Sequence, residues 1–171
     1  MKFAKRSLFP LFFILLVNTA HAQQTTLISD DFKTLTGCWE GNLNYLDYST
    51  NKPYSMPANL VITPIPSTFS FSVSNIYPDE PKANSIDTFL ISNEKKQVNK
   101  EVVQSRTKLK DGSLQIITEA EGRDGNDNKK AIFRHTFILG ENSYLNKKEV
   151  RFAGTSKWIT RHEYKYVRCK K

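Results

Sequence analysis

The 171-residue sequence lacks three features that would each indicate a common class of protein. Its longest apolar stretch, residues 8–17, is about ten residues long, whereas a membrane-spanning helix needs about 20. It has no glycine-rich phosphate loop and no G-x-S-x-G turn, so a nucleotide-dependent enzyme or a serine hydrolase has no support. After residue 36 no segment carries apolar residues at sustained helical spacing, so the rest of the chain is not expected to be helical.

The composition and the length indicate one folded domain. With 39% hydrophobic and 25% charged residues, the chain is not a disordered tail, a collagen-like fibre or a polytopic membrane protein. A domain has roughly 100–200 residues, and the sequence shows no internal repeat and no linker. We expect a signal segment over residues 1–22 and a single domain over residues 23–171.

The first 22 residues have the pattern of a secretory signal peptide. Basic residues precede the apolar stretch, and Ala20-His21-Ala22 follows it with the small-x-small pattern of a cleavage site. We expect cleavage after Ala22 and a secreted or periplasmic protein that begins at Gln23. No cysteine lies near this site, so no lipid anchor is expected. The apolar stretch is too short for a membrane-spanning helix, so no transmembrane anchor is expected in the mature chain.

The sequence contains only two cysteines, Cys38 and Cys169. In an oxidising compartment such a pair is typical of a disulfide, and two thiols alone cannot form a structural zinc site. We expect no metal and no cofactor.

The positive charge is modest and scattered. The formal net charge is +8, and removal of three basic residues with the signal segment leaves +5. The remaining basic pairs are placed at expected turns or at the terminus: Lys95-Lys96, Lys129-Lys130, Lys147-Lys148 and Lys170-Lys171. Such charges are typical of solvated loops, so no nucleic-acid partner is expected. We expect a monomer.

Period-two alternation of apolar and polar residues dominates from Cys38 onward and predicts an all-β domain. The expected strands begin at residue 38 and continue at 59–65, 68–77, 86–92, 97–109, 113–122, 131–139, 144–152 and 157–168. Short turn-like breaks favour antiparallel neighbours, and no long crossover is evident. We therefore predict an antiparallel up-and-down β-barrel of about 8–10 strands rather than a sandwich. A short helical segment that carries Phe32 and Leu35 precedes it.

Gly37-Cys38-Trp39-Glu40-Gly41 opens the first expected strand, and this G-x-W-x-G motif resembles that of the lipocalin-like (calycin) barrels. This group also includes fatty-acid-binding proteins and haem-binding nitrobindin-like barrels. The resemblance implies that Trp39 lies at the closed end of a barrel, where a basic residue of the last strand packs across it. The chain lacks the T-D-Y-like triplet of classical lipocalins, so the resemblance is to a divergent lipocalin-like barrel.

The last expected strand has one aromatic face, which we expect to point inward. This face consists of Trp158, Thr160, His162, Tyr164, Tyr166 and Arg168. On this parity Arg168, not Arg161, is the basic residue that reaches Trp39. Cys38 and Cys169 then both point outward on the first and last strands, which are antiparallel neighbours in a closed barrel, and we expect them to form a disulfide.

The inward aromatic residues and both mature histidines define a candidate ligand cavity. Its predicted wall consists of Trp39, Tyr45, Phe71, Phe133, His135, Trp158, His162 and Tyr164. An eight-stranded barrel is wide enough either to fill itself with side chains or to hold one small ligand. The sequence therefore predicts a carrier of a small hydrophobic molecule, and a structural module with a filled barrel remains an alternative.

The two histidines leave two further functions open. His135 and His162 could serve a hydrolase or isomerase together with an interior carboxylate, or they could ligate haem, which the nitrobindin resemblance allows. Neither histidine has a neighbouring ligand at metal-binding spacing, and a buried histidine that bonds to tyrosine explains the pattern equally. We expect a binding protein rather than an enzyme, with no catalytic residue assigned.

Overall fold

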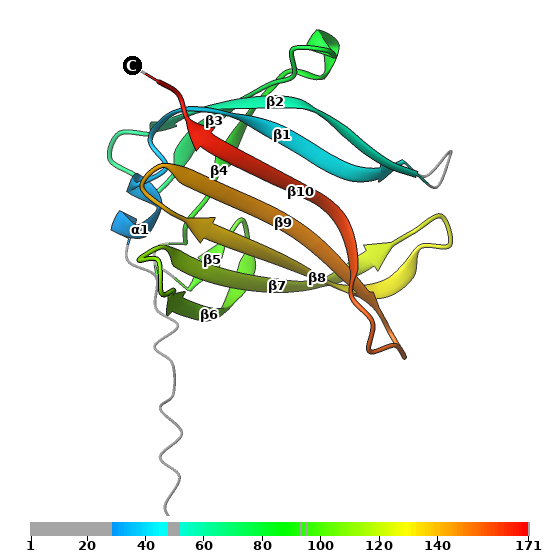
Figure 1. Ribbon diagram of the computed structural model, residues 1–171. Coiled ribbons are helices and arrows are strands. Elements are labelled where there is room, and N and C mark those ends of the chain that lie inside the picture. Colours follow the sequence, from blue (N-terminus) through cyan, green and yellow to red (C-terminus); the bar gives the residue numbers. More distant parts are fainter. Residues whose placement is uncertain (1–28, 48–51, 93, 95, 171) are drawn as a thin grey trace, which may run out of the picture.

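The computed structural model describes residues 29–47, 52–92, 94 and 96–170. The expected signal segment, residues 1–22, lies outside the described residues. Ten antiparallel strands form one sheet in the order β4-β3-β2-β1-β10-β9-β8-β7-β6-β5 (Figure 1). The elements are α1 (Ser29–Lys33), β1 (Gly37–Asp47), β2 (Lys52–Pro64), β3 (Phe71–Ile76), the 3₁₀ turn η1 (Pro81–Ala83), β4 (Ser85–Phe89), β5 (Gln97–Val98), β6 (Glu101–Lys108), β7 (Leu114–Asp124), β8 (Lys129–Leu139), β9 (Ser143–Phe152) and β10 (Ile159–Arg168).

The sheet curls into a nearly closed barrel. Its two end strands, β4 and β5, meet through an isolated antiparallel bridge between Ile91 and Val98, which we call the seam. Consecutive strands are neighbours everywhere else, and β1 pairs with β10. The predicted all-β, antiparallel up-and-down barrel with a short N-terminal helix is confirmed. Within the described ranges, no helix is long and apolar enough to cross a membrane.

The predicted strand over residues 97–109 is wrong, because a turn divides it into β5 and β6. Asn99 and Lys100 form this turn with φ of 50° and 70°, values that a β-strand does not adopt. The predicted turn at Lys147-Lys148 is also wrong, since both lysines lie within β9. A turn of two residues leaves the alternation on either side in step, so the pattern does not reveal the first feature. Lys147-Lys148 reads as a polar break because Lys148 faces the interior, where it pairs with His135 and His162.

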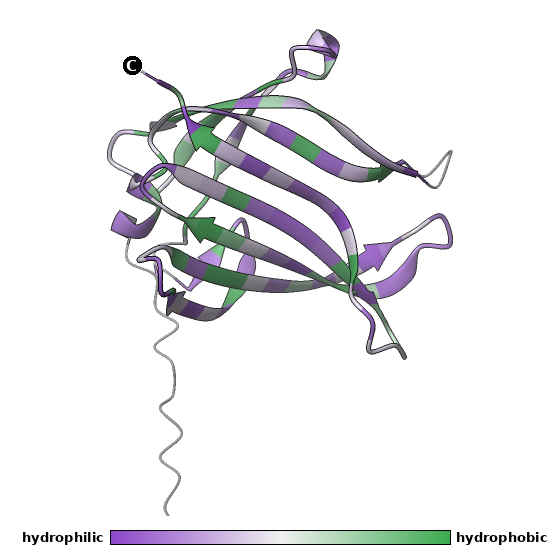
Figure 2. Cartoon of the chain, viewed as in Figure 1, coloured by the Kyte–Doolittle hydropathy of each residue, from purple (hydrophilic) through white to green (hydrophobic). Residues whose placement is uncertain are grey.

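Helix α1 covers one end of the barrel. Phe32 and Leu35 are 1% and 2% exposed, and the Phe32 ring lies 4.9 Å from Phe89 and 5.9 Å from Phe137. The Arg106 guanidinium donates to both carboxylate oxygens of Asp31 at 2.8 Å, so β6 holds the helix in place. Figure 2 shows that hydrophobic positions gather toward this end, whereas the β7–β8 hairpin and the middle of β9 are hydrophilic.

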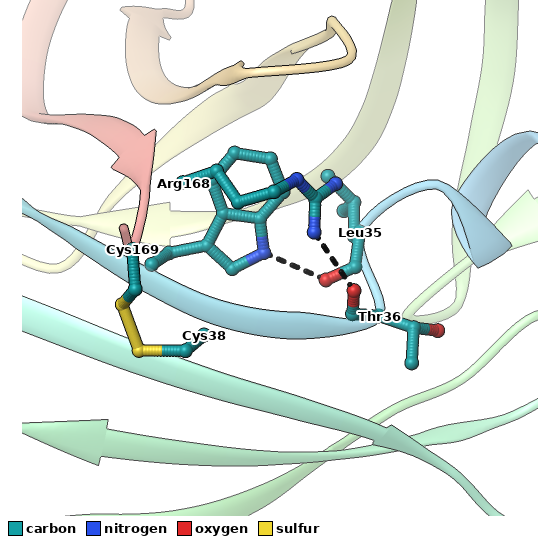
Figure 3. The surroundings of a disulfide bond; sticks show 6 residues. Leu35, Thr36, Cys38, Arg168 and Cys169 are labelled. Atoms are coloured by element: carbon teal, nitrogen blue, oxygen red, sulfur yellow. Dashed lines mark hydrogen bonds between the residues drawn. A yellow bond between two sulfur atoms is a disulfide. The ribbon is translucent and has the colours of Figure 1, made fainter. Parts of the chain in front are cut away.

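Trp39 and Arg168 pack together beneath the helix. The fully buried Trp39 donates from Nε1 to the Leu35 carbonyl at 2.7 Å, and the Arg168 guanidinium lies 4.2 Å from the indole centroid. Arg168 also donates to the Thr36 carbonyl at 3.0 Å (Figure 3). It donates further to the carbonyls of Thr34 at 2.7 Å and Glu141 at 2.9 Å. One side chain therefore satisfies the carbonyls where the helical turn passes into β1.

Glycine is required on either side of Trp39, for a different structural reason at each position. Gly37 has a φ of +122°, a backbone conformation that side chains strain, and it lies next to Arg168. A Cβ atom at Gly41 would lie 2.1 Å from the Lys165 carbonyl oxygen, so only glycine lets β1 and β10 approach this closely. The motif is thus a packing requirement of the barrel's closed end.

The disulfide between Cys38 and Cys169 is present, as predicted. The two Cα atoms lie 5.4 Å apart, and the Cys169 amide donates to the Cys38 carbonyl at 3.1 Å. Figure 3 shows the bond beside Arg168, where β1 begins and β10 ends. The bond links residues 131 positions apart and ties the two ends of the barrel chain together.

A candidate ligand-binding cavity and the polar belt beside it

The strand register arranges inward side chains in layers. Tyr164 pairs with Leu43 and Asn146, and Asn146 pairs with Phe137. Paired residues on antiparallel strands point to the same face, so these four side chains form one layer inside the barrel. The layer toward α1 is aromatic and aliphatic. The layer on the other side is the polar belt, which consists of Glu101, Thr118, His135, Lys148 and His162.

A cavity of about 270 Å³ lies between α1 and the seam. A water molecule occupies about 30 Å³ in the liquid, so this space equals the volume of about nine water molecules and suits one small ligand. Strand β4 forms part of its wall, and Asn99, from the turn after β5, forms another part. The lining residues are Phe32, Leu35, Leu60, Ile62, Phe71, Val73, Asn75, Tyr77, Ser85, Asp87, Thr88, Phe89, Asn99, Tyr144, Asn146, Tyr164 and Tyr166.

Three stacked tyrosines form one wall of the cavity. The rings of Tyr144 and Tyr166 lie 5.6 Å apart at 13°, and those of Tyr166 and Tyr164 lie 5.8 Å apart at 7°. Burial is the main cause that raises the pKa of all three phenols well above the usual value. The wall therefore stays uncharged, and its hydroxyl groups remain available as hydrogen-bond donors.

Polar groups meet this aromatic wall at two levels. The Tyr77 and Tyr164 hydroxyls share a hydrogen bond of 3.0 Å. Deeper in the wall, the Asn146 Oδ1 atom is buried and finds no hydrogen-bond partner among the described residues. At the β3–β4 wall, Asp87 accepts hydrogen bonds from Asn75 Nδ2 at 2.7 Å and Ser85 Oγ at 2.9 Å. The cavity thus combines an apolar body with a few fixed polar groups, as ligand sites usually do.

The polar belt begins with a carboxylate that is held by its neighbours. His135 Nδ1 lies 2.8 Å from both oxygens of Glu101, and the Thr118 hydroxyl donates to Glu101 at 2.5 Å. Burial alone would raise the pKa of Glu101, but the hydrogen bonds from His135 and Thr118 and the charge of Lys148 lower it overall. Glu101 is therefore ionised, and it ties β6, β7 and β8 together across the interior.

His162 occupies the opposite side of the belt. Its ring centroid lies 6.3 Å from that of His135 and 5.3 Å from that of Tyr164. Burial, reinforced by electrostatic interactions with His135 and Lys148, lowers the pKa of His162 to about 4. The His162 imidazole is consequently neutral at neutral pH.

The belt does not open onto the cavity. None of its five residues is among the side chains that line it. A catalytic acid or base must come within hydrogen-bond reach of the substrate, and the Glu101–His135 pair instead uses its hydrogen bonds within the protein. A haem in this cavity would likewise find no histidine on the wall to serve as an axial ligand, so the residues present do not fit that group.

Two of the eight predicted cavity residues line the observed cavity, namely Phe71 and Tyr164. Trp39 lies at the closed end, where the Tyr144 ring, 6.1 Å away, is part of the cavity wall. The other five lie elsewhere. His135 and His162 are in the belt, and Tyr45 packs against Tyr54 with ring centroids 5.4 Å apart.

Phe133 and Trp158 lie farther from the cavity. The Lys148 ammonium lies 4.7 Å from the Phe133 ring, on the side of the belt remote from α1. Trp158 lies on the outer face, where its ring contacts the guanidinium groups of Arg134 at 3.9 Å and Arg151 at 5.0 Å. The predicted inward position of Trp158 is thereby corrected.

A β-bulge in β10 explains the position of Trp158. The register between β9 and β10 shifts between Thr160 and His162, which leaves Arg161 as an extra residue. Beyond the shift Ile159 pairs with the fully buried Val150, so Ile159 faces inward. A bulge reverses the parity of every residue beyond it, and Trp158 and Thr160 therefore leave the inward face.

The sequence prediction missed the polar residues of the cavity. Tyr144 and Asn146 could have been found, because they alternate on β9 opposite the aromatic face of the last strand. Tyr77 could have been found as well, because it continues the parity of Phe71 and Val73 just beyond β3. Asp87 gave no such signal, since β4 is short, and its inward position follows from its pairing with Val73 on β3.

No protein-family model matches the sequence, and the curated proteins contain no match either. Three solved structures are similar in architecture. The crystal structure of Rv2717c from M. tuberculosis aligns with 85% of this chain and 99% of its own, with a TM-score of 0.55 and 9% identity. A protein of unknown function from the DUF3598 family of Nostoc punctiforme covers 90% of this chain and 54% of its own, with a TM-score of 0.48 and 15% identity.

The third structure is the S-type phycobiliprotein lyase CPES from Guillardia theta. It covers 83% of this chain and 92% of its own, with a TM-score of 0.48 and 11% identity. The alignment with the M. tuberculosis structure extends over nearly the whole of that protein. At this level of identity it shows a shared barrel fold and nothing about the ligand.

Proposed function

We propose that this protein is an exported binding protein for one small, largely apolar molecule, held in the cavity between α1 and the seam. The observation that carries the proposal is the Asn146 Oδ1 atom, which is buried beside the stacked tyrosines of the wall and has no partner among the described residues. A buried acceptor without a partner costs roughly 1–3 kcal/mol, a cost that a ligand donor would remove. The disulfide supports export, because such bonds persist in oxidising compartments.

Direct titration tests the proposal. Calorimetry with indole and with 1-octanol should give saturable binding of one molecule per chain. Val73 lines the cavity, so Val73→Phe should fill it and weaken binding at least tenfold. Ile86 lies nearby on β4 with 77% exposure, and Ile86→Phe is the matched control that should leave binding unchanged.

Two results would contradict the proposal. Absence of binding to any apolar probe would favour the structural module with a filled barrel. Equal weakening by both phenylalanine substitutions would place the binding site outside this cavity. N-terminal sequencing of the protein secreted or released from the periplasm tests export, and a start at Gln23 is expected.

A further inference from the structure

We propose that the cavity selects a protonated amine, namely an ammonium group on a small aromatic or alkyl body, with the cation placed against Asp87. The inference deepens the proposed function and rests on it. It follows from the distribution of charge around the cavity, from the rings beside that charge, and from the acceptor deeper in the wall.

The charge at the cavity is of one sign. Among the described lining residues Asp87 is the only carboxylate, and none is a lysine, arginine or histidine. The Asp87 Oδ2 atom accepts hydrogen bonds from Asn75 and Ser85, which are neutral donors and leave the negative charge in place. No cationic side chain in the described ranges forms a salt bridge with Asp87. The carboxylate is thus held in a fixed orientation, with no ion-pair partner among the described residues.

Aromatic rings lie beside this carboxylate. Tyr77 and Tyr164 line the same cavity and are joined through their hydroxyl groups. Burial, the hydrogen bond with Tyr77 and the charge of Asp87 together raise the pKa of Tyr164, which agrees with a carboxylate close to that phenol. A cation near Asp87 can also lie over an aromatic face, a favourable arrangement for ammonium groups.

The second recognition group is the acceptor at Asn146. Its Oδ1 atom is buried in the cavity wall without a partner, and Asn146 pairs with Tyr164 in the strand register. A ligand that reaches it should carry a donor on its apolar body, such as an indole N–H or a phenolic O–H. Every group assigned a role here, the carboxylate at the rim and the amide oxygen in the wall, accepts hydrogen bonds. An arylethylamine with such a donor on its ring carries a group suited to each of them.

Anionic ligands are disfavoured by the same arrangement. A carboxylate in the cavity would meet Asp87, a like charge, and an amide oxygen that cannot donate to it. The interior lysine Lys148 and both histidines belong to the belt and do not line the cavity. Head-group charge should therefore discriminate among ligands with identical bodies.

The test uses three indole compounds that differ only near the head group: tryptamine, the neutral tryptophol and indole-3-acetate. Calorimetry at neutral pH and low salt should show tryptamine binding at least tenfold more tightly than tryptophol, and indole-3-acetate most weakly. Asp87→Asn should remove the preference for tryptamine and leave the tryptophol affinity unchanged. Asp127 lies in the exposed β7–β8 turn, so Asp127→Asn is a control with the same loss of charge and should retain the preference.

The outcomes separate this inference from the proposed function. If tryptophol binds as tightly as tryptamine, or indole-3-acetate binds more tightly, the amine inference is overturned while the binding function stands. If Asp87→Asn leaves the preference intact, the carboxylate is not its source and the inference fails. If none of the three compounds binds the wild-type protein, both the inference and the cavity function fail.

Discussion

Asn146 is a residue whose properties suit a ligand rather than the fold. Its Oδ1 atom is buried without a partner, on a strand where the paired positions on both sides carry the aromatic residues Phe137 and Tyr164. Removing an unsatisfied polar atom from such surroundings relieves its desolvation cost. Groups of this kind are kept where function requires them.

We predict that Asn146→Leu stabilises the protein and weakens its ligand binding. Replacing the unpaired amide by an apolar group of similar size should raise the free energy of unfolding by roughly 1–3 kcal/mol. Urea denaturation measures this change, and titration with tryptophol should show lower affinity. A loss of stability would mean that Asn146 has a partner in the ligand-free protein, and it would remove the main support for the cavity as a binding site.

His162 makes the stability of the protein sensitive to acid. Its pKa is about 4 in the folded state and 6.5 in a model peptide, so the unfolded chain binds the proton more readily. The free energy of unfolding should therefore be fully retained above pH 6.5 and fall as the pH drops toward 4, by at most about 3 kcal/mol. His135 and Lys148 face His162 and reinforce this effect. Below about pH 4.5, protonation of Glu101 adds a further loss, because its pKa is lowered in the folded state.

Substitution of His162 by a neutral residue tests this dependence. His162→Gln should flatten the profile between pH 6.5 and 4, as measured by urea denaturation at several pH values. The loss that Glu101 causes at lower pH should persist in the variant. Identical slopes for variant and wild type over the upper range would mean that another group titrates there.

At the scale of elements, the sequence allowed prediction of the strands and of the closed end of the barrel. It did not allow prediction of which side chains face inward along the whole of β10. The alternation from Cys38 onward indicated the antiparallel barrel, and the G-x-W-x-G motif placed Trp39 beside Arg168. The bulge at Arg161 was invisible, because an extra residue does not alter the local composition on either side. The guanidinium of Arg161 forms an ion pair with Asp124, a contact between distant strands that only the assembled barrel creates.

The two tryptophans should therefore differ sharply in their contribution to stability. Trp39→Ala removes a fully buried indole and the surface on which Arg168 packs, and should cost about 3–5 kcal/mol. Trp158→Ala removes contacts with Arg134 and Arg151 on the outer face, and should cost about 1–2 kcal/mol. Chemical denaturation of both variants measures the difference. Equal costs would contradict the assignment of Trp158 to the outer face.

The whole molecule depends on the closure of the chain at Cys38 and Cys169. A disulfide across a loop of more than 100 residues restricts the unfolded chain, and in the chain-entropy model it stabilises by up to about 5 kcal/mol. The double variant Cys38→Ser/Cys169→Ser should lose stability of this order but keep its cavity, since neither cysteine lines it. Urea denaturation together with tryptophol titration checks both expectations. Free thiols in the native, oxidised wild-type protein would contradict the bond.

The wall of the barrel closes unevenly. Nine junctions between neighbouring strands are ladders of paired residues. In contrast, β4 and β5 are joined by the bridge between Ile91 and Val98 and by the backbone hydrogen bonds from Asn99 to Leu90 and from Ser92 to Gln97. Strand β4 pairs with β3 along its other edge and carries Asp87 and Phe89 into the cavity. The seam is thus a shorter contact than the long ladders of β1, β9 and β10, and β4 beside it lines the cavity, so we expect a ligand to pass at β4.

Hydrogen exchange followed by mass spectrometry should detect this weakness. Opening free energies are lowest where backbone hydrogen bonds are few, so peptides covering β4 and β5 should exchange faster than those covering β1, β9 and β10. Saturation with tryptophol should slow exchange in β4, because the bound molecule contacts its inner face, and should leave the β7–β8 hairpin unchanged. Uniform exchange around the barrel would mean that the seam is as stable as the continuous ladders. Protection confined to the β7–β8 hairpin would place ligand access at the opposite end, beside the polar belt.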